Sequence, residues 1–344
     1  MIASLLGRLL QARPLSAAET RTTFDSLLSS RTSDLERTAV LVALAARPTT
    51  APELTQFVRE FERRAVPFRV PSGDHPIDLC GSGGARTPSF NVSTVSAFVV
   101  AAAGAPVVKH GNRSARGPCG SSDLLEALGL PVVESIPFAR ATYRKMRLAF
   151  LHAPLFHPAT RAAGAARRAL GIPTVFNQLG PLSNPAHVPF QVVGVADLPT
   201  AVRTAEVMKR LGRRRAMAVT SAEGCDEFSP KRETEAVVLS DGRLTRRTIF
   251  AKDLLPPEDR RGSWGPLPPD DAAEEARRIL AGGGGARRGS VLLTAGAALW
   301  VAGAVRRLSE GVERSRAALD SGDAETILAR MTDVAARFRR LRGA

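Results

Sequence analysis

The sequence predicts an α/β protein, in which a small all-helical region precedes a larger part with a sheet flanked by helices. Three observations support this fold class. Residues 1–70 show only helical patterns of apolar residues. From Ile77 onward, short apolar runs alternate with helical periodicity, as they do in α/β sheets. Finally, Ser240-Asp241-Gly242 separates two strand-like runs and is typical of a hairpin turn.

The chain of 344 residues is long enough for two subdomains around a sizeable core. Its 44% content of hydrophobic residues is typical of globular proteins. No apolar run reaches the roughly 18 residues that a membrane helix needs. The amphipathic stretch at residues 2–10 lacks the basic region and the cleavage site of a signal peptide. We therefore expect a cytoplasmic protein without a membrane partner.

The formal net charge is +15, from 48 Lys and Arg against 33 Asp and Glu. Such a charge is compatible with nucleic-acid binding, with attraction of anionic small substrates, or with arginines spread over helix surfaces. The cations are scattered along the chain, and aromatic residues make up only 5% of it, too few for base-stacking platforms. We favour spread arginines, with substrate attraction second, and do not expect a nucleic-acid partner.

The first 70 residues contain start signals for several helices. Ser16 with Glu19 and Thr50 with Glu53 form capping-box patterns, and a further apolar run begins at Asp34. No chemistry is visible in this segment, so it is either a helical subdomain or a dimer interface. The stretch 67–76 is expected to be a linker.

The remaining elements follow from the period of the apolar residues. Pro- and Gly-rich stretches at 255–269 and 282–289 are expected to be exposed connections. The expected strands are 77–80, 105–108, 148–151, 191–195, 216–220, 234–239 and 243–249, and the expected helices include 95–103, 124–128, 157–170, 200–211 and 291–304.

Two loops between a strand and a helix have the composition of an anion site. The first, Gly81-Ser82-Gly83-Gly84, allows close approach of the backbone to a ligand, and Ser93 or Thr94 is expected to cap the next helix. The second begins with Lys109-His110-Gly111-Asn112-Arg113-Ser114 and runs through Gly120-Ser121-Ser122-Asp123 into a helix. Free N–H groups, a helix N-terminus and two cations together indicate a phosphate site.

At this point the chain resembles a known family. The blocks GSGG…FNVST, KHGNRS…GSSDLLEALG, FHPA…FNQLGPLSNPA and GCDEFS occur in the order found in anthranilate phosphoribosyltransferases, which belong to the nucleoside-phosphorylase-like phosphoribosyltransferases. The resemblance extends over nearly the whole chain. It implies a helical domain of residues 1–70 with a middle segment near 160–190, and a large α/β domain of residues 74–344 with a mixed sheet. It also implies a homodimer formed through the helical domain.

The resemblance further implies transfer of the phosphoribosyl group of 5-phosphoribosyl-1-pyrophosphate (PRPP) to anthranilate, a step of tryptophan biosynthesis that needs Mg²⁺. Arg167 is the implied ligand of the anthranilate carboxylate, and helix geometry lets only one of Arg167 and Arg168 face a cleft. The implied PRPP-binding residues are Gly81, Gly84, Ser89, Asn91, Ser93, Thr94, Lys109 and Ser121. The implied anthranilate-binding residues are Gly81, Asn112 and Arg167, and the implied metal ligands are Ser93, Asp226 and Glu227.

The first loop departs from the family pattern. Family members usually have GTGGD followed by Gly, whereas this chain has Ala85 and Arg86 at the last two positions. Arg116 also stands where the family has serines and lysine. These changes remove a negative charge and add two cations, so Arg86 and Arg116 are candidate phosphate contacts. Either PRPP is held differently here, which we favour, or its turnover is weakened or lost.

Several alternatives stay open from the sequence alone. His110 is either a general base or a structural histidine. The acceptor could be another aromatic amine or a nucleobase, as in pyrimidine nucleoside phosphorylases, and a non-catalytic relative that binds nucleic acid is the third hypothesis. Cys80, Cys119 and Cys225 lie in or beside the proposed ligand loops, which suggests sensitivity to oxidation, although separate reduced thiols are the preferred interpretation.

Overall fold

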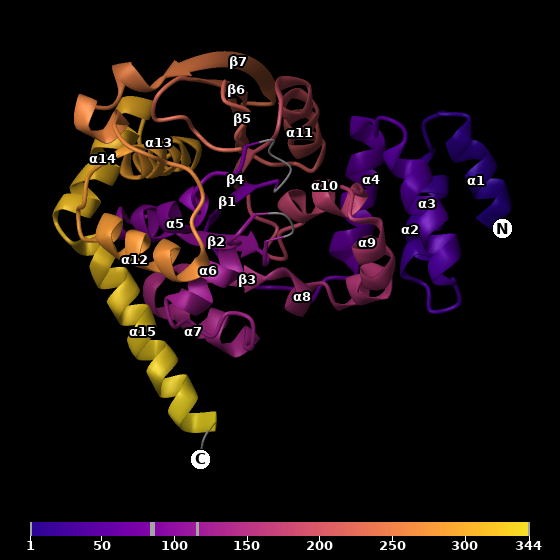
Figure 1. Ribbon diagram of the computed structural model, residues 1–344, viewed down its shortest axis with the longest axis horizontal. Coiled ribbons are helices and arrows are strands. Elements are labelled where there is room, and N and C mark those ends of the chain that lie inside the picture. Colours follow the sequence, from indigo (N-terminus) through magenta and orange to yellow (C-terminus); the bar gives the residue numbers. More distant parts are fainter. Residues whose placement is uncertain (1, 83–86, 115–116, 343–344) are drawn as a thin grey trace.

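The computed structural model describes residues 2–82, 87–114 and 117–342. Its first four elements are helices, as the sequence predicts: α1 (Ile2–Leu10), α2 (Ala17–Leu28), α3 (Asp34–Ala45) and α4 (Ala51–Arg63). Both predicted capping boxes are confirmed, at Ser16 and at Thr50. A third, formed by Ser33 and Glu36, starts α3. These helices form one end of the molecule (Figure 1).

A seven-stranded mixed sheet forms the centre of the protein, with strand order β3-β2-β1-β4-β5-β6-β7. The first five strands of this order are parallel, and β6 and β7 add to it antiparallel. The chain leaves β1 for β2 on one side and later pairs β4 on the other, so the order reverses beside β1. Ligands of such sheets bind at the carboxyl ends of the strands near this reversal. The strands are β1 (Ile77–Gly81), β2 (Val107–Gly111), β3 (Leu148–His152), β4 (Phe190–Gly194), β5 (Arg215–Ser221), β6 (Glu233–Ser240) and β7 (Arg243–Phe250).

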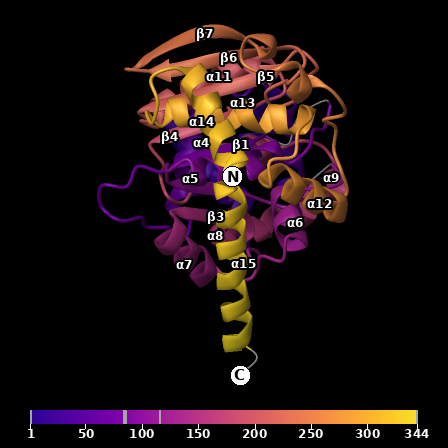
Figure 2. The same ribbon diagram turned by 90° about the vertical axis from the view of Figure 1, so that its left-hand side faces the viewer.

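Helices cover both faces of the sheet (Figures 1 and 2). The core on one face is built largely with α5 and α13, and the core on the other face joins α11 to the N-terminal helices. The last helix, α15, extends past the rest of the molecule to the C-terminus (Figure 2). These helices are α5 (Val92–Ala102), α6 (Ser121–Ala127), α7 (Ile136–Met146), α11 (Leu198–Arg210), α12 (Pro269–Leu280), α13 (Ala286–Val301), α14 (Leu308–Asp320) and α15 (Asp323–Arg342).

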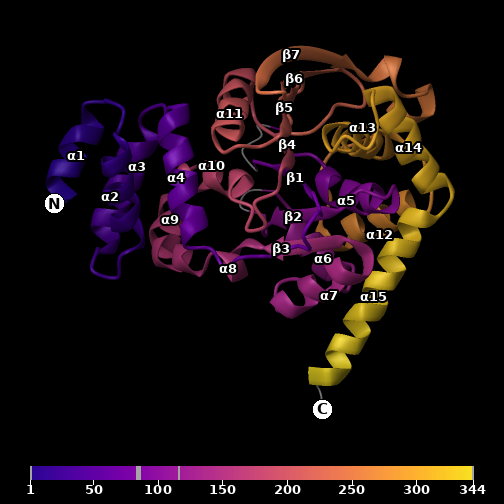
Figure 3. The ribbon, with the colours of Figure 1, turned by 180° about the vertical axis from the view of Figure 1, so that it is seen from behind.

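Three short helices follow β3: α8 (Ala153–Phe156), α9 (Gly164–Leu170) and α10 (Val175–Leu182), of which α9 and α10 pack against the N-terminal helices. Buried side chains of α9 and α10 share one apolar core with those of α1 to α4. As a result, α10 lies between the helical end and the sheet (Figure 3). The division into two domains with the predicted boundaries stays a prediction.

Two expectations about helices are wrong. The predicted helix 157–170 is a 3₁₀ helix over Pro158–Ala163 followed by α9, and a tighter turn of this kind is common where a helix begins. The predicted exposed connection 282–289 contains the start of α13 at Ala286. Arg288 is buried there because it pairs with Asp259, which is itself buried inside the other predicted connection, 255–269.

The strand β7 is at a free edge of the sheet, and its sequence RLTRRTIF leaves most side chains exposed. Arg243, Arg246 and Arg247 therefore contribute positive charge along this edge. Among the residues that the structure describes, no helix is both long and apolar enough to cross a membrane.

Candidate active site

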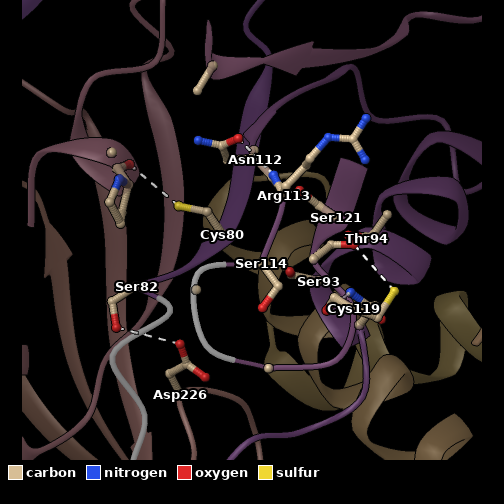
Figure 4. Close-up of a pocket in the computed structure, with 18 of the residues that line it drawn as sticks. Cys80, Ser82, Ser93, Thr94, Asn112, Arg113, Ser114, Cys119, Ser121 and Asp226 are labelled. Atoms are coloured by element: carbon tan, nitrogen blue, oxygen red, sulfur yellow. Dashed lines mark hydrogen bonds between the residues drawn. The ribbon is translucent and has the colours of Figure 1, made fainter. Parts of the chain in front are cut away.

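A cavity of about 630 Å³ opens at the carboxyl ends of β1 and β2, where the strand order reverses. Its lining includes residues of the two predicted anion loops and of the acidic loop after β5 (Figure 4). The helices α9 and α10 also contribute to it. Gly84, Ala85, Arg86 and Arg116 lie outside the described residues. Every other predicted site residue lines the cavity: Gly81, Ser89, Asn91, Ser93, Thr94, Lys109, His110, Asn112, Ser121, Arg167, Asp226 and Glu227.

The start of α5 differs from the prediction that Ser93 or Thr94 caps it. The helix begins at Val92, and its cap residue Asn91 makes no side-chain capping bond. Instead the N–H of Ser93 donates to a carboxylate oxygen of Glu227 at 3.3 Å. The side chain of Asn91 is used elsewhere, because it donates to the carbonyl of Cys119 at 3.1 Å. A carboxylate from a distant loop thus does the work of a local cap.

Lys109, in the second anion loop, binds the strand and the helix that flank the first anion loop. Its ammonium group is buried and donates to the carbonyl of Leu79 at 2.5 Å and to the hydroxyl of Ser93 at 3.2 Å. The side chain thus fixes the end of β1 to the first turn of α5. Its charge also lies near two buried carboxyls, Asp78 and Glu227, and favours their ionised forms.

Asp226 and Glu227 follow β5 on a loop and are both buried. Burial, followed by the neighbouring charge of Asp226, raises the pKa of Glu227 to about 8. Ser82, in the first anion loop, donates its hydroxyl hydrogen to Asp226 at 3.5 Å (Figure 4). Two adjacent buried acids are costly without a cation, and Mg²⁺ binds through one or two carboxylates with water and phosphate oxygens as its other ligands. The donor set therefore fits a magnesium ion that a phosphorylated substrate helps to hold.

Glycines keep the acidic loop close to the strands. A Cβ atom on Gly194 would overlap the carbonyl oxygen of Asp226, and one on Gly81 would lie 2.8 Å from a carboxylate oxygen of the same residue. Gly81 and Gly194 are paired in neighbouring strands. Because Gly81 and Gly194 have no side chains at these paired positions, Asp226 can lie against both strands and reach the cavity.

The second anion loop closes on Asp123, at the first turn of α6. The N–H groups of Ser114 and Gly120 donate to its carboxylate at 3.0 and 2.8 Å. Burial raises the pKa of Asp123, but these N–H groups and Arg113 outweigh burial and lower it. Arg113 lines the cavity and also pairs with Asp123 and Glu126, so its charge is already balanced. Ser121, the first residue of α6, donates its hydroxyl hydrogen to the carbonyl of Asn112 at 3.0 Å and so joins the two ends of the loop.

Arg167, on α9, lines the part of the cavity that the helical side of the protein contributes. Its guanidinium lies 4.9 Å from the ring centre of Phe176 and forms no ion pair with any described residue. Burial lowers the pKa of this guanidinium, although it stays charged at neutral pH. Arg168 is exposed, which confirms that only one of the two arginines faces the cavity. A half-buried guanidinium in this environment is suited to bind a carboxylate.

His110 resembles a structural histidine more than a general base. Its Nδ1 lies 3.0 Å from the carbonyl oxygen of Gly180, so Nδ1 must bear the proton and donate it. Burial lowers the pKa of His110 to about 3, which keeps the ring neutral.

The three cysteine thiols are also kept neutral by burial. Burial raises the pKa of Cys80, raises that of Cys119 to about 12 and raises that of Cys225 to about 11. Little thiolate forms, which argues against the oxidation hypothesis.

Several residues that line the cavity carried no assignment from the sequence. Phe176, Asn177, Gly180 and Pro181 come from α10, and the block FNQLGP was the signal that could have identified them. Phe90 was not identified either, because a phenylalanine does not indicate a ligand without its position in space.

Two family models match the chain. A helical bundle domain of a glycosyl transferase family matches residues 3–65, and the α/β domain of a glycosyl transferase family matches residues 73–325. The anthranilate phosphoribosyltransferase of Methylobacterium radiotolerans is 39% identical over 321 residues, which cover 92% of this chain and 91% of that protein. The same enzyme of a Synechococcus species is 39% identical over 323 residues, 93% of each chain.

Solved structures agree with these relatives. The anthranilate phosphoribosyltransferase of Thermus thermophilus superposes with a TM-score of 0.86 at 33% identity, covering 96% of this chain and 99% of that one. The enzyme of Saccharomyces cerevisiae, solved in complex with PRPP and Mg, shares the fold at 22% identity, with a TM-score of 0.81 over 98% of both chains.

Proposed function

The chain belongs to the anthranilate phosphoribosyltransferase family, and on that premise we propose that it transfers the phosphoribosyl group of PRPP to anthranilate in tryptophan biosynthesis. The products are N-(5-phosphoribosyl)anthranilate and pyrophosphate. A bond forms between the amine nitrogen and C1 of the ribose, the bond from C1 to the pyrophosphate breaks, and the amine loses a proton. One observation supports this most: a single cavity holds an acidic pair with two loops of anion-binding composition on one side and the guanidinium of Arg167 on the other.

The PRPP side is assigned to the two loops and the start of α5. The backbone of Gly81, the first turn of α5 with Ser93 and Thr94, and the loop residues Asn91 and Ser121 would surround the phosphates. Ser89 and Lys109 line the same cavity, and we expect Lys109 to hold the two loops in register, since it begins the second loop and its ammonium binds β1 and α5, which flank the first. Helix N-termini and free N–H groups are suited to phosphate oxygens.

We assign Mg²⁺ to Asp226 and Glu227, with the hydroxyl of Ser93 as a third ligand. When bound, the ion neutralises charge on the leaving pyrophosphate. The chain itself contributes the burial of both carboxylates and the contact of Glu227 with the N–H of Ser93, which holds the acids beside the phosphate loops.

The acceptor side is assigned to Arg167, Asn112 and the backbone of Gly81. Arg167 would bind the carboxylate of anthranilate and direct its amine toward the ribose. The reaction then depends on positioning and on electrostatics, with no covalent intermediate on the protein. Arg86 and Arg116 remain proposed phosphate contacts, in place of the acid that the family usually has at Ala85.

A fluorescence assay tests the function directly. Anthranilate fluorescence should fall when PRPP and Mg²⁺ are both present, and should stay constant when either is omitted. Constant fluorescence with both present would reject the activity. Turnover of a nucleoside with phosphate, measured with the same preparation, would favour the nucleoside phosphorylase alternative instead.

We also propose a homodimer that uses the helical end. Leu10 of α1 is 76% exposed and Leu35 of α3 is 81% exposed, and these two helices pack against each other. The family resemblance and this apolar surface support the same interface. Sedimentation of the wild-type protein should give a dimer, and Leu35→Lys should shift it toward monomer without loss of helical signal. A monomeric wild-type protein would contradict the proposal.

A further inference from the structure

The end of α10 is fixed by side chains from elsewhere in the protein. The last carbonyl groups of a helix have no partner within the helix. In α10 the problem is greater, because Pro185 has no N–H to donate to the carbonyl of Pro181, four residues earlier. The sequence therefore requires outside donors at this helix end.

Five consecutive carbonyl groups, those of residues 179–183, each accept a hydrogen bond from a side chain. Every donor side chain is buried, and two of them, His110 on β2 and Gln191 on β4, come from the central sheet. The donors are Ser183 to Leu179 at 2.9 Å, His110 to Gly180 at 3.0 Å, Gln191 to Pro181 at 2.5 Å, Arg213 to Leu182 at 3.1 Å and His157 to Ser183 at 3.1 Å. The thiol of Cys80 is a second, longer donor to Pro181, at 3.4 Å.

Gln191 is the member of this group that joins the sheet to the helix without lining the cavity. It lies on β4, is fully buried, and its amide donates both to the carbonyl of Pro181 and to a carboxylate oxygen of Asp78, the latter at 3.2 Å. The other carboxylate oxygen of Asp78 accepts the N–H of His110 at 3.1 Å. One buried network thus sets the position of α10 relative to β1 and β2.

The position of α10 matters because this helix forms the wall that supports Arg167. Phe176, on α10, lies under the guanidinium of Arg167, and Gly180 and Pro181 line the same cavity. The residues proposed to hold PRPP lie on the sheet side. A shift of α10 would move the acceptor wall while leaving the phosphate loops in place.

We propose that Gln191 is a positioning residue of the acceptor site, which acts through the carbonyl of Pro181 and thereby holds α10 and Arg167 at the correct distance from the strand ends. This inference rests on the proposed function, because the acceptor is assigned there. A purely structural role would change stability or both substrates alike, whereas a positioning role changes anthranilate binding selectively.

Gln191→Met tests this, since it keeps the length of the side chain and removes both donors. It also removes the buried Oε1 of Gln191, which has no partner among the described residues, so the fold should tolerate the change. The KM for anthranilate should rise by about tenfold, the loss expected for one buried hydrogen bond, while the KM for PRPP stays within about twofold. Equal rises in both constants, or no rise, would overturn the inference.

Val192→Ala is the matched control, because Val192 is the next residue of β4 and is buried on the opposite face of the sheet. It should lower the Tm and leave both KM values unchanged. If Gln191→Met does not fold, Gln191→Asn, whose amide is one methylene too short to span both partners, takes its place with the same expected selectivity.

Hydrogen exchange separates this inference from the proposed function. Amide protons of residues 175–180, 182 and 183 should exchange faster in Gln191→Met than in the wild type, and should not change in Val192→Ala. This measurement needs no substrate, so it remains decisive if the wild type shows no transfer to anthranilate. Unchanged exchange in α10 would overturn the positioning role even if the wild-type enzyme is active.

Discussion

The N–H of Ser93 donates to a carboxylate oxygen of Glu227 at 3.3 Å, although 134 residues separate the two in the sequence. This contact joins the first turn of α5 to the acidic loop after β5. The residues proposed to bind phosphate and those proposed to bind Mg²⁺ therefore form one structural unit. Lys109 stabilises this unit through its hydrogen bond to the hydroxyl of Ser93. A change in either loop should affect both ligands.

Loss of the acidic pair should abolish magnesium-dependent turnover. The double variant Asp226→Ala with Glu227→Ala removes both proposed metal ligands, and turnover should fall by about a hundredfold or more, since the metal supplies several kcal/mol of charge stabilisation. Mg²⁺ should also no longer raise the Tm in the presence of PRPP. The control is Glu235→Ala, which removes an acid of β6 outside the cavity. Retained turnover in the double variant would put the metal elsewhere.

Arg167→Ala should weaken anthranilate binding selectively. A hydrogen bond to a charged group contributes about 1.5–3 kcal/mol, so the KM for anthranilate should rise about 10- to 100-fold. The KM for PRPP should change much less, because Arg167 belongs to α9, which contributes no residue to the proposed PRPP site. Arg168→Ala removes the adjacent, exposed arginine and should have little effect on either constant. Equal rises for both substrates in Arg167→Ala would refute the assignment.

Gly194→Ala should destabilise the protein and displace the acidic loop. The new methyl group would overlap the backbone of Asp226, which cannot move as freely as a side chain. We expect a loss of about 1–3 kcal/mol in the free energy of unfolding, together with weaker Mg²⁺ binding. Denaturant unfolding and calorimetry measure the two effects. Gly7→Ala is the control: a Cβ atom there meets nothing within 4 Å, and the helix should gain up to about 1 kcal/mol.

The helical end should be sensitive to acid through Glu53. Burial raises the pKa of Glu53, but Arg47 and the N–H groups of Leu15 and Thr50 outweigh it and hold the pKa below its ordinary value of 4.5. A carboxyl with a lowered pKa stabilises the folded state above 4.5, and this stability is lost as the pH falls toward the folded pKa.

Glu53→Gln should therefore lose about 3–5 kcal/mol at neutral pH, as expected when one partner of a buried ion pair is removed, and should flatten the dependence of Tm on pH below 4.5. Glu36→Gln changes the equivalent capping residue of α3, which is exposed, and should have a smaller effect. An unchanged acid transition in Glu53→Gln would show that the pair does not control acid stability.

Local sequence signals identified those features that depend on neighbouring residues. The capping boxes at Ser16 and Thr50 need only residues three apart, and both are confirmed. The hairpin at Ser240-Asp241-Gly242 is confirmed for the same reason, since the turn fixes which strands pair. The two anion loops were identified from their composition at strand ends, and parallel strands bring those ends to one edge of the sheet. The individual ligand residues came from the family resemblance.

Features that depend on distant contacts could not be inferred in this way. The sequence around Ser93 predicted a local side-chain cap for α5. Instead the N–H of Ser93 donates to the carboxylate of Glu227, and nothing in the local sequence indicates this partner. The start of α13 was hidden because Arg288 and Gly289 look like surface residues until Asp259 lies against them. Gln191 appeared as one polar residue in an apolar strand, and its role emerges only with the carbonyl of Pro181 beside it.

The arginines of β7 oppose edge-to-edge association of two copies of the protein. An outermost strand offers unpaired N–H and C=O groups to any other extended chain, and the sheet has such a strand in β7. Arg243, Arg246 and Arg247 place like charges where a second copy would have to add on, so two such edges repel each other. Part of the large positive charge thus acts as protection against aggregation, a role that needs no ligand and that high salt would weaken.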